Sequence, residues 1–402
     1  FTFLFKETNS SQDYNQGKKF SGVLGIEEYK DIAVYCTYDD ELKQGAEYVN
    51  GQYTYRYMQE GTIASSGLAW NNISNNGWGV QLNDKGTDAV TSKVCTYINN
   101  KPITSMSYMF YESQATTIDL SNFDTSNVTN MGYMFCNAQA TTIDVSNFDT
   151  SKVTDMGWMF SYSKATTLDV SNFNTSNVTD MSSMFYYSEA TTLDVSNFDT
   201  SKVTDMGYMF SDSKATTIDL SNFDTSNVTD MSSMFTESQA TTIDVSNFNT
   251  SNVTNMSSMF YKSKATTLDV SNFDTSNVTN MYGMFVLSQT TTIDVSNFNT
   301  SKVTNMEGMF ESSQATTLDL SNFDTSKVTS MGSMFHNSTN LKTIYVSNKF
   351  NTDKVTYSYY MFSGCTNLVG GAGTKYNGSY VDKTYARIDG GTSNPGYFTA
   401  KN

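Results

Sequence analysis

Apolar and polar positions alternate at the start of a pattern that returns every 25 residues between positions 115 and 339. The copy at 115–139 reads ATTIDLSNFDTSNVTNMGYMFCNAQ. In its first part, Ile118 and Leu120 fall on one side of the chain, and Thr117, Asp119 and Ser121 on the other. A period of two is typical of a strand with one buried face. Each copy therefore predicts a short strand near its beginning.

The second part of each copy has a different spacing. Val128, Met131, Met134 and Phe135 recur at intervals of three, three and one, which favours a helix with one apolar face. The group 124–126, Asp-Thr-Ser, precedes them and suits a turn and a helix N-cap. Each copy therefore predicts a strand, a turn and a short helix.

Stacking of the copies follows from their composition, since one short strand cannot bury its apolar side alone. We predict an α/β repeat solenoid with a continuous parallel strand face, strands about 4.8 Å apart, and short helices on the opposite face. The register A-x-x-I-x-L-x-x-F resembles the leucine-rich repeat frame, with Phe123 in place of the usual Asn or Cys. The nine full units begin at Ala115, Ala140, Ala165, Ala190, Ala215, Ala240, Ala265, Thr290 and Ala315.

Three regions are expected along the chain. Residues 1–102 do not repeat, and stretches such as FTFLF at 1–5 and GQYTYRY at 51–57 predict a β-rich N-terminal domain or cap, with Trp70 and Trp78 in or near its core. Residues 103–362 form the repeat region: a partial unit, the nine full units at 115–339, and a degenerate unit. Residues 363–402, rich in Gly and Tyr, are expected to form a C-terminal cap.

Methionine is concentrated in two columns of the repeat. All but one of the 22 methionines, Met58, lie in M-x-x-M-F columns such as Met131 and Met134. A sulfur-rich stripe can serve metal or redox chemistry, but a stacked core of adaptable apolar side chains is the simpler interpretation.

Charge and residue types exclude several classes of function. The net charge of -16 argues against nucleic acid and against an anionic membrane surface as partners. One histidine, His336, leaves little room for histidine-based catalysis or a multi-histidine metal site. No apolar run is long enough for a transmembrane segment. Cys36 and Cys95 lie together in the N-terminal region and could form a disulfide or remain two buried thiols.

The unit DLSNFDTSNVTNMGYMF at 119–135 closely resembles the BspA-like leucine-rich repeats of bacterial surface proteins, a group also described as a 25-residue domain of unknown function in mycoplasma and Gram-positive surface proteins. The lead-in at 77–110 and the tail from Cys365 are similar to flanking segments of such proteins. The resemblance implies a secreted or cell-surface protein, often an adhesin for host matrix or other cells. Eight of the nine units depart from the family pattern by carrying Ala before the strand.

The constant face of the repeat presents a column of carboxylates. Like charges about 5 Å apart should repel one another, and oxygen-ligated Ca²⁺ could relieve the repulsion. A solvated ladder bonded to neighbouring Thr and Ser hydroxyls is the simpler interpretation, because no EF-hand or RTX-type motif is present. The column consists of Asp119, Asp144, Asp169, Asp194, Asp219, Asp244, Asp269, Asp294 and Asp319.

The variable positions lie between and after the methionines, on the expected outward helix positions and the following turn. Exposed Tyr and Trp are favoured at interfaces, so a selective partner would be recognised there, although partial packing on neighbouring turns is the alternative. The candidates are Tyr133, Trp158, Tyr162, Tyr186, Tyr187, Tyr208, Tyr261 and Tyr282.

These features favour an adhesion or protein-interaction platform that binds a host matrix protein, a glycan or another cell-surface partner. The alternative is a structural subunit that self-assembles end to end into an extracellular filament or surface layer. Ice binding by the outward Thr columns is a weaker third hypothesis. An enzyme is not expected, since columns replicated nine times do not make one asymmetric pocket.

Overall fold

The computed structural model of the protein describes residues 33–58 and 76–401. FTFLF at 1–5 and Trp70, which the sequence placed in the N-terminal domain, lie outside these residues. The described residues belong to one compact unit that begins at Ala33. Their buried apolar side chains form one continuous core from Tyr53 to Phe398.

A six-stranded sheet forms the N-terminal part of this unit, with the strand order β1-β5-β6-β4-β3-β2. Tyr53, Tyr55 and Tyr57 alternate with outward Thr54 and Arg56, so one face of β3 is buried, as its period of two requires. Trp78 on β4 is fully buried, which confirms its place in the core. The strands are β1 (Tyr35–Cys36), β2 (Glu47–Asn50), β3 (Tyr53–Met58), β4 (Gly77–Leu82), β5 (Tyr97–Ile98) and β6 (Lys101–Ser105).

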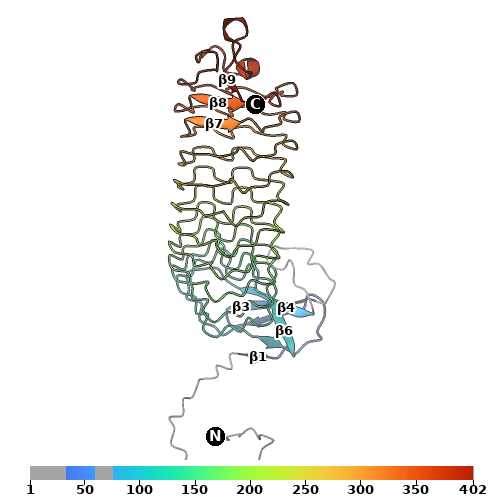
Figure 1. Ribbon diagram of the computed structural model, residues 1–402. Helices are drawn as coiled ribbons and strands as arrows, with labels where there is room; N and C mark the ends of the chain where they lie inside the picture. The colour runs from blue at the N-terminus through green and yellow to red at the C-terminus, as the bar shows by residue number, and fades with distance from the viewer. Residues whose placement is uncertain (1–32, 59–75, 402) are drawn as a thin grey trace, which may run out of the picture. The chain divides into compact units, whose positions relative to one another are not determined.

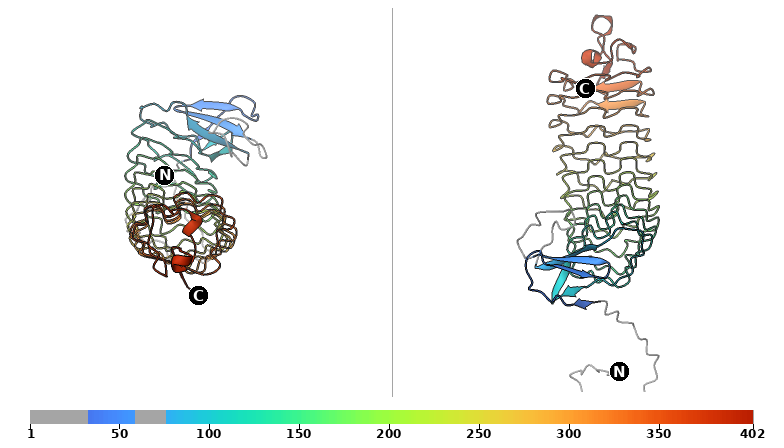
Figure 2. Two further views of the ribbon diagram at one scale, coloured as in Figure 1. Left: turned by 90° about the horizontal axis from the view of Figure 1, so that it is seen from above. Right: turned by 180° about the vertical axis from the view of Figure 1, so that it is seen from behind.

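From β6 onward the chain winds into coils that lie one above another (Figures 1 and 2). Parallel bridges join equivalent residues of successive coils, as in Asn130 to Asp155 and Asp155 to Asp180, so the coil period is 25 residues. The contact extends back to the N-terminal sheet through a bridge between Ser105 and Asn130. Sheet and coils therefore share one hydrogen-bond network as well as one core.

The short helices predicted for each unit are absent from the described residues. The only helical elements there are two 3₁₀ turns in the C-terminal tail, η3 (Lys383–Tyr385) and η4 (Gly391–Ser393). The Met-containing segment runs instead as successive tight turns: the Met134 N–H donates to the Met131 carbonyl at 3.1 Å, and the Cys136 N–H to the Tyr133 carbonyl at 3.1 Å. The prediction of an α/β solenoid with short helices is wrong.

Two features of the backbone explain the error. The intervening N–H groups donate to the next coil, as from Tyr133 to the Gly157 carbonyl at 2.9 Å, whereas a helix would use every N–H within its own turn. Tyr133 and Asn137 also have positive φ angles of 59° and 56°, and their equivalents in the other full coils do too. Left-handed residues interrupt a right-handed helix, while the turns still place every apolar residue inward.

The predicted continuous strand face is also largely missing. A regular parallel sheet forms only from β7 (Thr317–Leu320), β8 (Thr343–Val346) and β9 (Phe398–Ala400), in that order. In earlier coils this face has isolated bridges and single backbone bonds, such as Thr166 N–H to the Thr141 carbonyl at 3.1 Å. The inter-coil hydrogen bonds are more numerous on the opposite, turn-containing face.

Columns of identical side chains fill the centre of the coils. Phe135, Phe160 and Phe185 stack with ring centroids 5.5 and 5.9 Å apart and nearly parallel planes. The paired methionines, such as Met131 and Met134, are completely buried, which confirms the methionine columns as core. Aligned apolar columns allow each coil to cover the next.

Polar side chains complete the hydrogen bonding between coils. The buried Thr150 hydroxyl donates to the Asn174 carbonyl at 3.0 Å and accepts from the Asn174 N–H at 2.8 Å, and this pairing recurs along the stack. The Asn147 side-chain amide donates to the carbonyls of Leu120 and Phe123, both at 3.0 Å. The conserved spacing of SNFDTS therefore serves the corner of the coil, where backbone groups would otherwise lack partners.

Asp389 organises the tail that follows the last coil. Its carboxylate accepts bonds from the Thr374 hydroxyl at 2.6 Å and from the N–H groups of Ala372, Thr374 and Gly391 at 2.8 to 2.9 Å. Burial alone would raise the pKa of Asp389, but these bonds hold it at about 2.

We expect Asp389→Asn to lower the free energy of unfolding of the tail by about 1–3 kcal/mol, because an amide cannot accept all of these bonds. The pKa of Asp389 is depressed in the folded state, so its stabilisation is present above about pH 4, the unfolded value, and is lost as the pH falls toward 2. Hydrogen exchange of residues near Gly371 against pH measures both effects. Equal protection in the variant and the native chain would contradict this role.

Candidate functional site

The strand face carries the predicted column of aspartates, exposed from Asp119 to Asp294 and half-buried at Asp319. Each carboxylate accepts the N–H two residues further on, as Asp244 does from Ser246 at 3.0 Å. The Ser246 hydroxyl and N–H lower the pKa of Asp244, so it stays ionised. Asp319 is contacted by the Lys401 ammonium. The column is a series of charged turn-forming residues.

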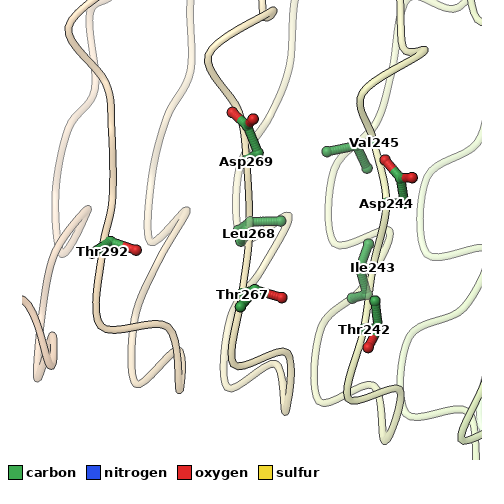
Figure 3. Close-up of a pocket in the computed structure, with 8 residues that line it drawn as sticks. All are labelled: Thr242, Ile243, Asp244, Val245, Thr267, Leu268, Asp269 and Thr292. Carbon is green, nitrogen blue, oxygen red and sulfur yellow. The ribbon is translucent and has the colours of Figure 1, made fainter.

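A shallow open depression lies on this face (Figure 3). Thr242 and Asp244 line it from one coil, Thr267 and Asp269 from the next, and Thr292 from a third. The lining repeats with the coil and contains no histidine, lysine or thiol. Among the described residues, no group of three or more His, Cys, Asp or Glu side chains is placed to hold a metal ion.

A second row of carboxylates, which sequence reasoning missed, lies half-buried on the turn face. Asp155, Asp180, Asp205 and Asp230 occupy consecutive coils and are joined by direct backbone bridges. Asn residues end the row: Asn130 donates to Asp155 at 2.9 Å and Asn255 to Asp230 at 3.1 Å. The signal was visible in the sequence as four consecutive Asp at a position that is Asn in four of the other full units and Ser in the last, at Ser330.

The row predicts an unusual response to acid. Burial raises the pKa of Asp155 and Asp205, and the charge of Asp180 raises both further. At these two positions the folded chain binds more protons than the unfolded chain, so their contribution to stability rises as the pH falls from neutral toward about 4. Combined Asp155→Asn and Asp205→Asn substitution should reduce this slope, measured by urea unfolding at several pH values.

The control is Asp169→Asn in the exposed column, because hydrogen bonds from Ser171 lower the pKa of Asp169. This substitution removes a contribution of opposite sign and cannot flatten the slope in the same direction. An unchanged slope in the double variant would contradict proton uptake by the row.

The predicted aromatic positions divide into two groups. Those of the first group contact one another across coils 103–214: Tyr108 and Tyr133 stack at 4.4 Å between ring centroids, and Tyr133 and Trp158 at 5.4 Å. Tyr261 and Tyr282 lie in later coils, where Tyr261 packs against the Lys262 ammonium. We call the first group, together with Tyr108, the aromatic cluster; it comprises Tyr108, Tyr133, Trp158, Tyr162, Tyr186, Tyr187 and Tyr208.

Tyr186 makes the cluster continuous. The third coil has Ser183 where its neighbours have Trp158 and Tyr208, and the Tyr186 ring lies edge-to-face with both, at 5.7 and 5.8 Å. Tyr186 also contacts Tyr187 edge-to-face at 4.8 Å. A residue from a different position of the unit thus fills the gap in the column.

Exposure within the cluster is uneven. Tyr162, Tyr187 and Tyr208 are 41 to 44% exposed, whereas Tyr133, Trp158 and Tyr186 are half-buried against neighbouring rings. Burial raises the pKa of Tyr108, Tyr133 and Tyr186, so their hydroxyls remain protonated donors at neutral pH. Sequence reasoning missed Tyr108, although it occupies the same column in the partial unit.

Cys36 and Cys95 form a disulfide in the N-terminal sheet, with their Cα atoms 5.9 Å apart. The bond links the segment of β1 to the loop before β5. Cys136 and Cys365 are free and buried. Across the described ranges, no helix has the length and apolarity that a membrane-spanning helix needs.

The repeat region matches one protein family along most of its length. Four overlapping matches, at residues 85–196, 161–268, 187–292 and 284–393, are to the family described as "Mycoplasma protein of unknown function, DUF285". The chain belongs to this family. It is a repeat protein of that group, while the BspA-like leucine-rich repeat assignment made from the motif is not confirmed by the match. No curated protein and no solved structure matched the chain.

Proposed function

We propose that this family member is a secreted or cell-surface protein that uses its turn face as an adhesion or protein-interaction platform. The observation that carries the proposal is the aromatic cluster, in which Tyr and Trp side chains from five successive coils meet on one surface. Tyr and Trp combine a large contact area with a polar edge, and they are enriched among residues that dominate binding energy.

Comparison of the coils supports a role for the aromatic side chains beyond packing. The position of Tyr133, Trp158 and Tyr208 holds Ser in four other full coils and Gly in two, with the same positive φ angle. An aromatic side chain is therefore unnecessary for the coil to form. A disulfide is typical of proteins that mature in an oxidising compartment, and Cys36–Cys95 accordingly supports an extracellular or cell-surface location.

A matched pair of variants tests the platform. The first replaces Trp158, Tyr187 and Tyr208 with Ser; the second replaces Tyr282 with Ser, the residue found at the equivalent Ser257. Tyr282 is 45% exposed and lies outside the cluster, so it controls for loss of a surface tyrosine. Both variants and the native chain are applied to arrays of matrix proteins and glycans. We expect the triple variant alone to lose binding; equal binding by all three would overturn the proposal.

The alternative functions receive less support from the described residues. End-to-end assembly needs an open final coil, but Phe362 packs against Tyr397 and Phe398 of the tail, with ring centroids 5.1 and 5.9 Å apart. Ice binding needs an uncharged Thr array, and the ionised Asp column runs beside the Thr columns. We further propose that the protein is not an enzyme, because the clustered tyrosine and tryptophan side chains are suited to binding a partner rather than to cleaving a bond.

A further inference from the structure

One column of the turn face changes its chemistry from coil to coil. Residues 25 positions apart occupy the same place in successive coils, and in five consecutive coils the residues of this column have positive φ angles between 51° and 55°. Two tyrosines are followed by two carboxylates and then by one ammonium group. The residues are Tyr162, Tyr187, Asp212, Glu237 and Lys262.

At the fifth of these residues the chain supplies its own cation. The Lys262 ammonium lies 2.7 Å from the Glu237 carboxylate and 5.1 Å from the centre of the Tyr261 ring. An ammonium between a carboxylate and an aromatic face is held by charge attraction and by the ring quadrupole together. A second ammonium–ring contact joins Lys85 to Tyr111 of the partial unit, with the Lys85 nitrogen 4.7 Å from the ring centre.

Asp212 lies in the coil before Glu237, and the position one coil further on, where Lys262 stands relative to Glu237, is here Glu237 itself. Burial and the Glu237 charge raise the pKa of Asp212, while hydrogen bonds from the Ser211 and Tyr187 hydroxyls lower it; the Ser211 hydroxyl donates to Asp212 at 3.1 Å. Within the described part of the chain, Asp212 forms no ion pair. Lys214 acts on it only from beyond ion-pairing distance.

The charge around the cluster favours a cationic guest. The turn-face segments 155–164, 180–189, 205–214 and 230–239 contain seven carboxylates and two lysines. Lys164 is paired with Glu189 at 3.5 Å and Lys262 of the next coil with Glu237, so five of the seven carboxylates, among the described residues, form no ion pair. Aromatic rings beside uncompensated carboxylates attract guanidinium and ammonium groups, and Arg stacks on them best because its guanidinium is planar.

We propose that the aromatic cluster and Asp212 dock a basic, arginine-bearing segment of a partner protein, whose cation pairs with the Asp212 carboxylate beside Tyr187. The proposal rests on the platform function and names the chemistry of its partner. The excess of carboxylates over lysines on this face favours a cationic segment over a neutral glycan.

The test uses the full chain and three labelled probes: a nonapeptide of Arg-Gly-Ser repeats, its citrulline counterpart, and a neutral oligosaccharide. Binding is followed by fluorescence polarisation at low and at physiological salt. Asp212→Lys should weaken binding of the arginine peptide by about tenfold or more, since it gives this site its own cation. Lys262 shows that the position accommodates lysine. Trp158→Ser should weaken binding less, and Tyr282→Ser should leave it unchanged.

The outcomes separate this inference from the platform function. Preference for arginine over citrulline, lost in Asp212→Lys and reduced by salt, supports the inference. Equal binding of the two peptides, or full binding by Asp212→Lys, overturns it. Oligosaccharide binding that is lost in Trp158→Ser, without binding of the arginine peptide, overturns the inference and retains the platform. Binding of any partner that survives removal of the whole cluster overturns the platform itself.

Discussion

Phe235→Ala is expected to lower the free energy of unfolding of the stack by about 3–5 kcal/mol, since it removes a buried aromatic ring and leaves a cavity. Phe235 is completely buried and stacks between Phe210 at 5.9 Å and Phe260 at 5.8 Å. Because each coil contacts only its neighbours, the loss falls on two interfaces in the middle of the array. Urea unfolding followed by circular dichroism measures the change.

The position of the substitution provides a second readout. A stack with nearest-neighbour coupling should unfold in two steps when its centre is weakened, whereas Phe110→Ala beside the N-terminal sheet should keep a single transition. Tyr282→Ser on the surface should change the stability by less than about 0.5 kcal/mol. A loss below 1 kcal/mol for Phe235→Ala would show that the phenylalanine column does not couple the coils.

Thr225→Val is expected to cost about 2–4 kcal/mol, although the two side chains have nearly the same shape. The buried Thr225 hydroxyl donates to the Asn249 carbonyl at 3.0 Å and accepts from the Asn249 N–H at 2.8 Å. Valine leaves both backbone groups without a partner inside the coil corner, and each unsatisfied group costs about 1–3 kcal/mol. Thermal and urea unfolding measure the loss.

Thr225→Ser is the matched control for this prediction. It keeps the hydroxyl and removes only a methyl group, so we expect a loss of about 1 kcal/mol or less. If valine and serine destabilise the stack equally, the reciprocal hydrogen bonds contribute nothing beyond packing. If valine alone is destabilising, the threonine column holds the corners together.

The period and the core could be predicted from the sequence because they depend on residue identity alone. Ile118, Leu120 and Met131 are buried as their apolar character requires. The helices could not be predicted, because the spacing of Val128, Met131 and Met134 fits a helix and a run of tight turns equally well. The choice between them is made by inter-coil hydrogen bonds, which are contacts between residues 24 positions apart. Local periodicity contains no information about such contacts.

The candidate site could be predicted residue by residue but not as a surface. Variation between coils identified Trp158, Tyr187 and Tyr208, and the structure brings them together through Tyr186. The Tyr186 ring lies between Trp158 and Tyr208, in the space left by the small side chain of Ser183. This placement depends on the rotamer of Tyr186, which an alignment of the repeats does not predict. The half-buried row that includes Asp205 was overlooked for a similar reason: its burial follows from the turn path of the backbone, not from its residue type.

The hydrogen bonds between coils have a mechanical consequence. They connect each coil to the next, so a load applied between the two ends of the stack would act on the interfaces one after another instead of shearing them together. Each interface that opens releases a coil of 25 residues, or roughly 80–90 Å of extended chain. Under the drag of flowing liquid, such a chain would lengthen in equal steps and dissipate mechanical energy at each step. The coils that remain closed would keep their surface intact.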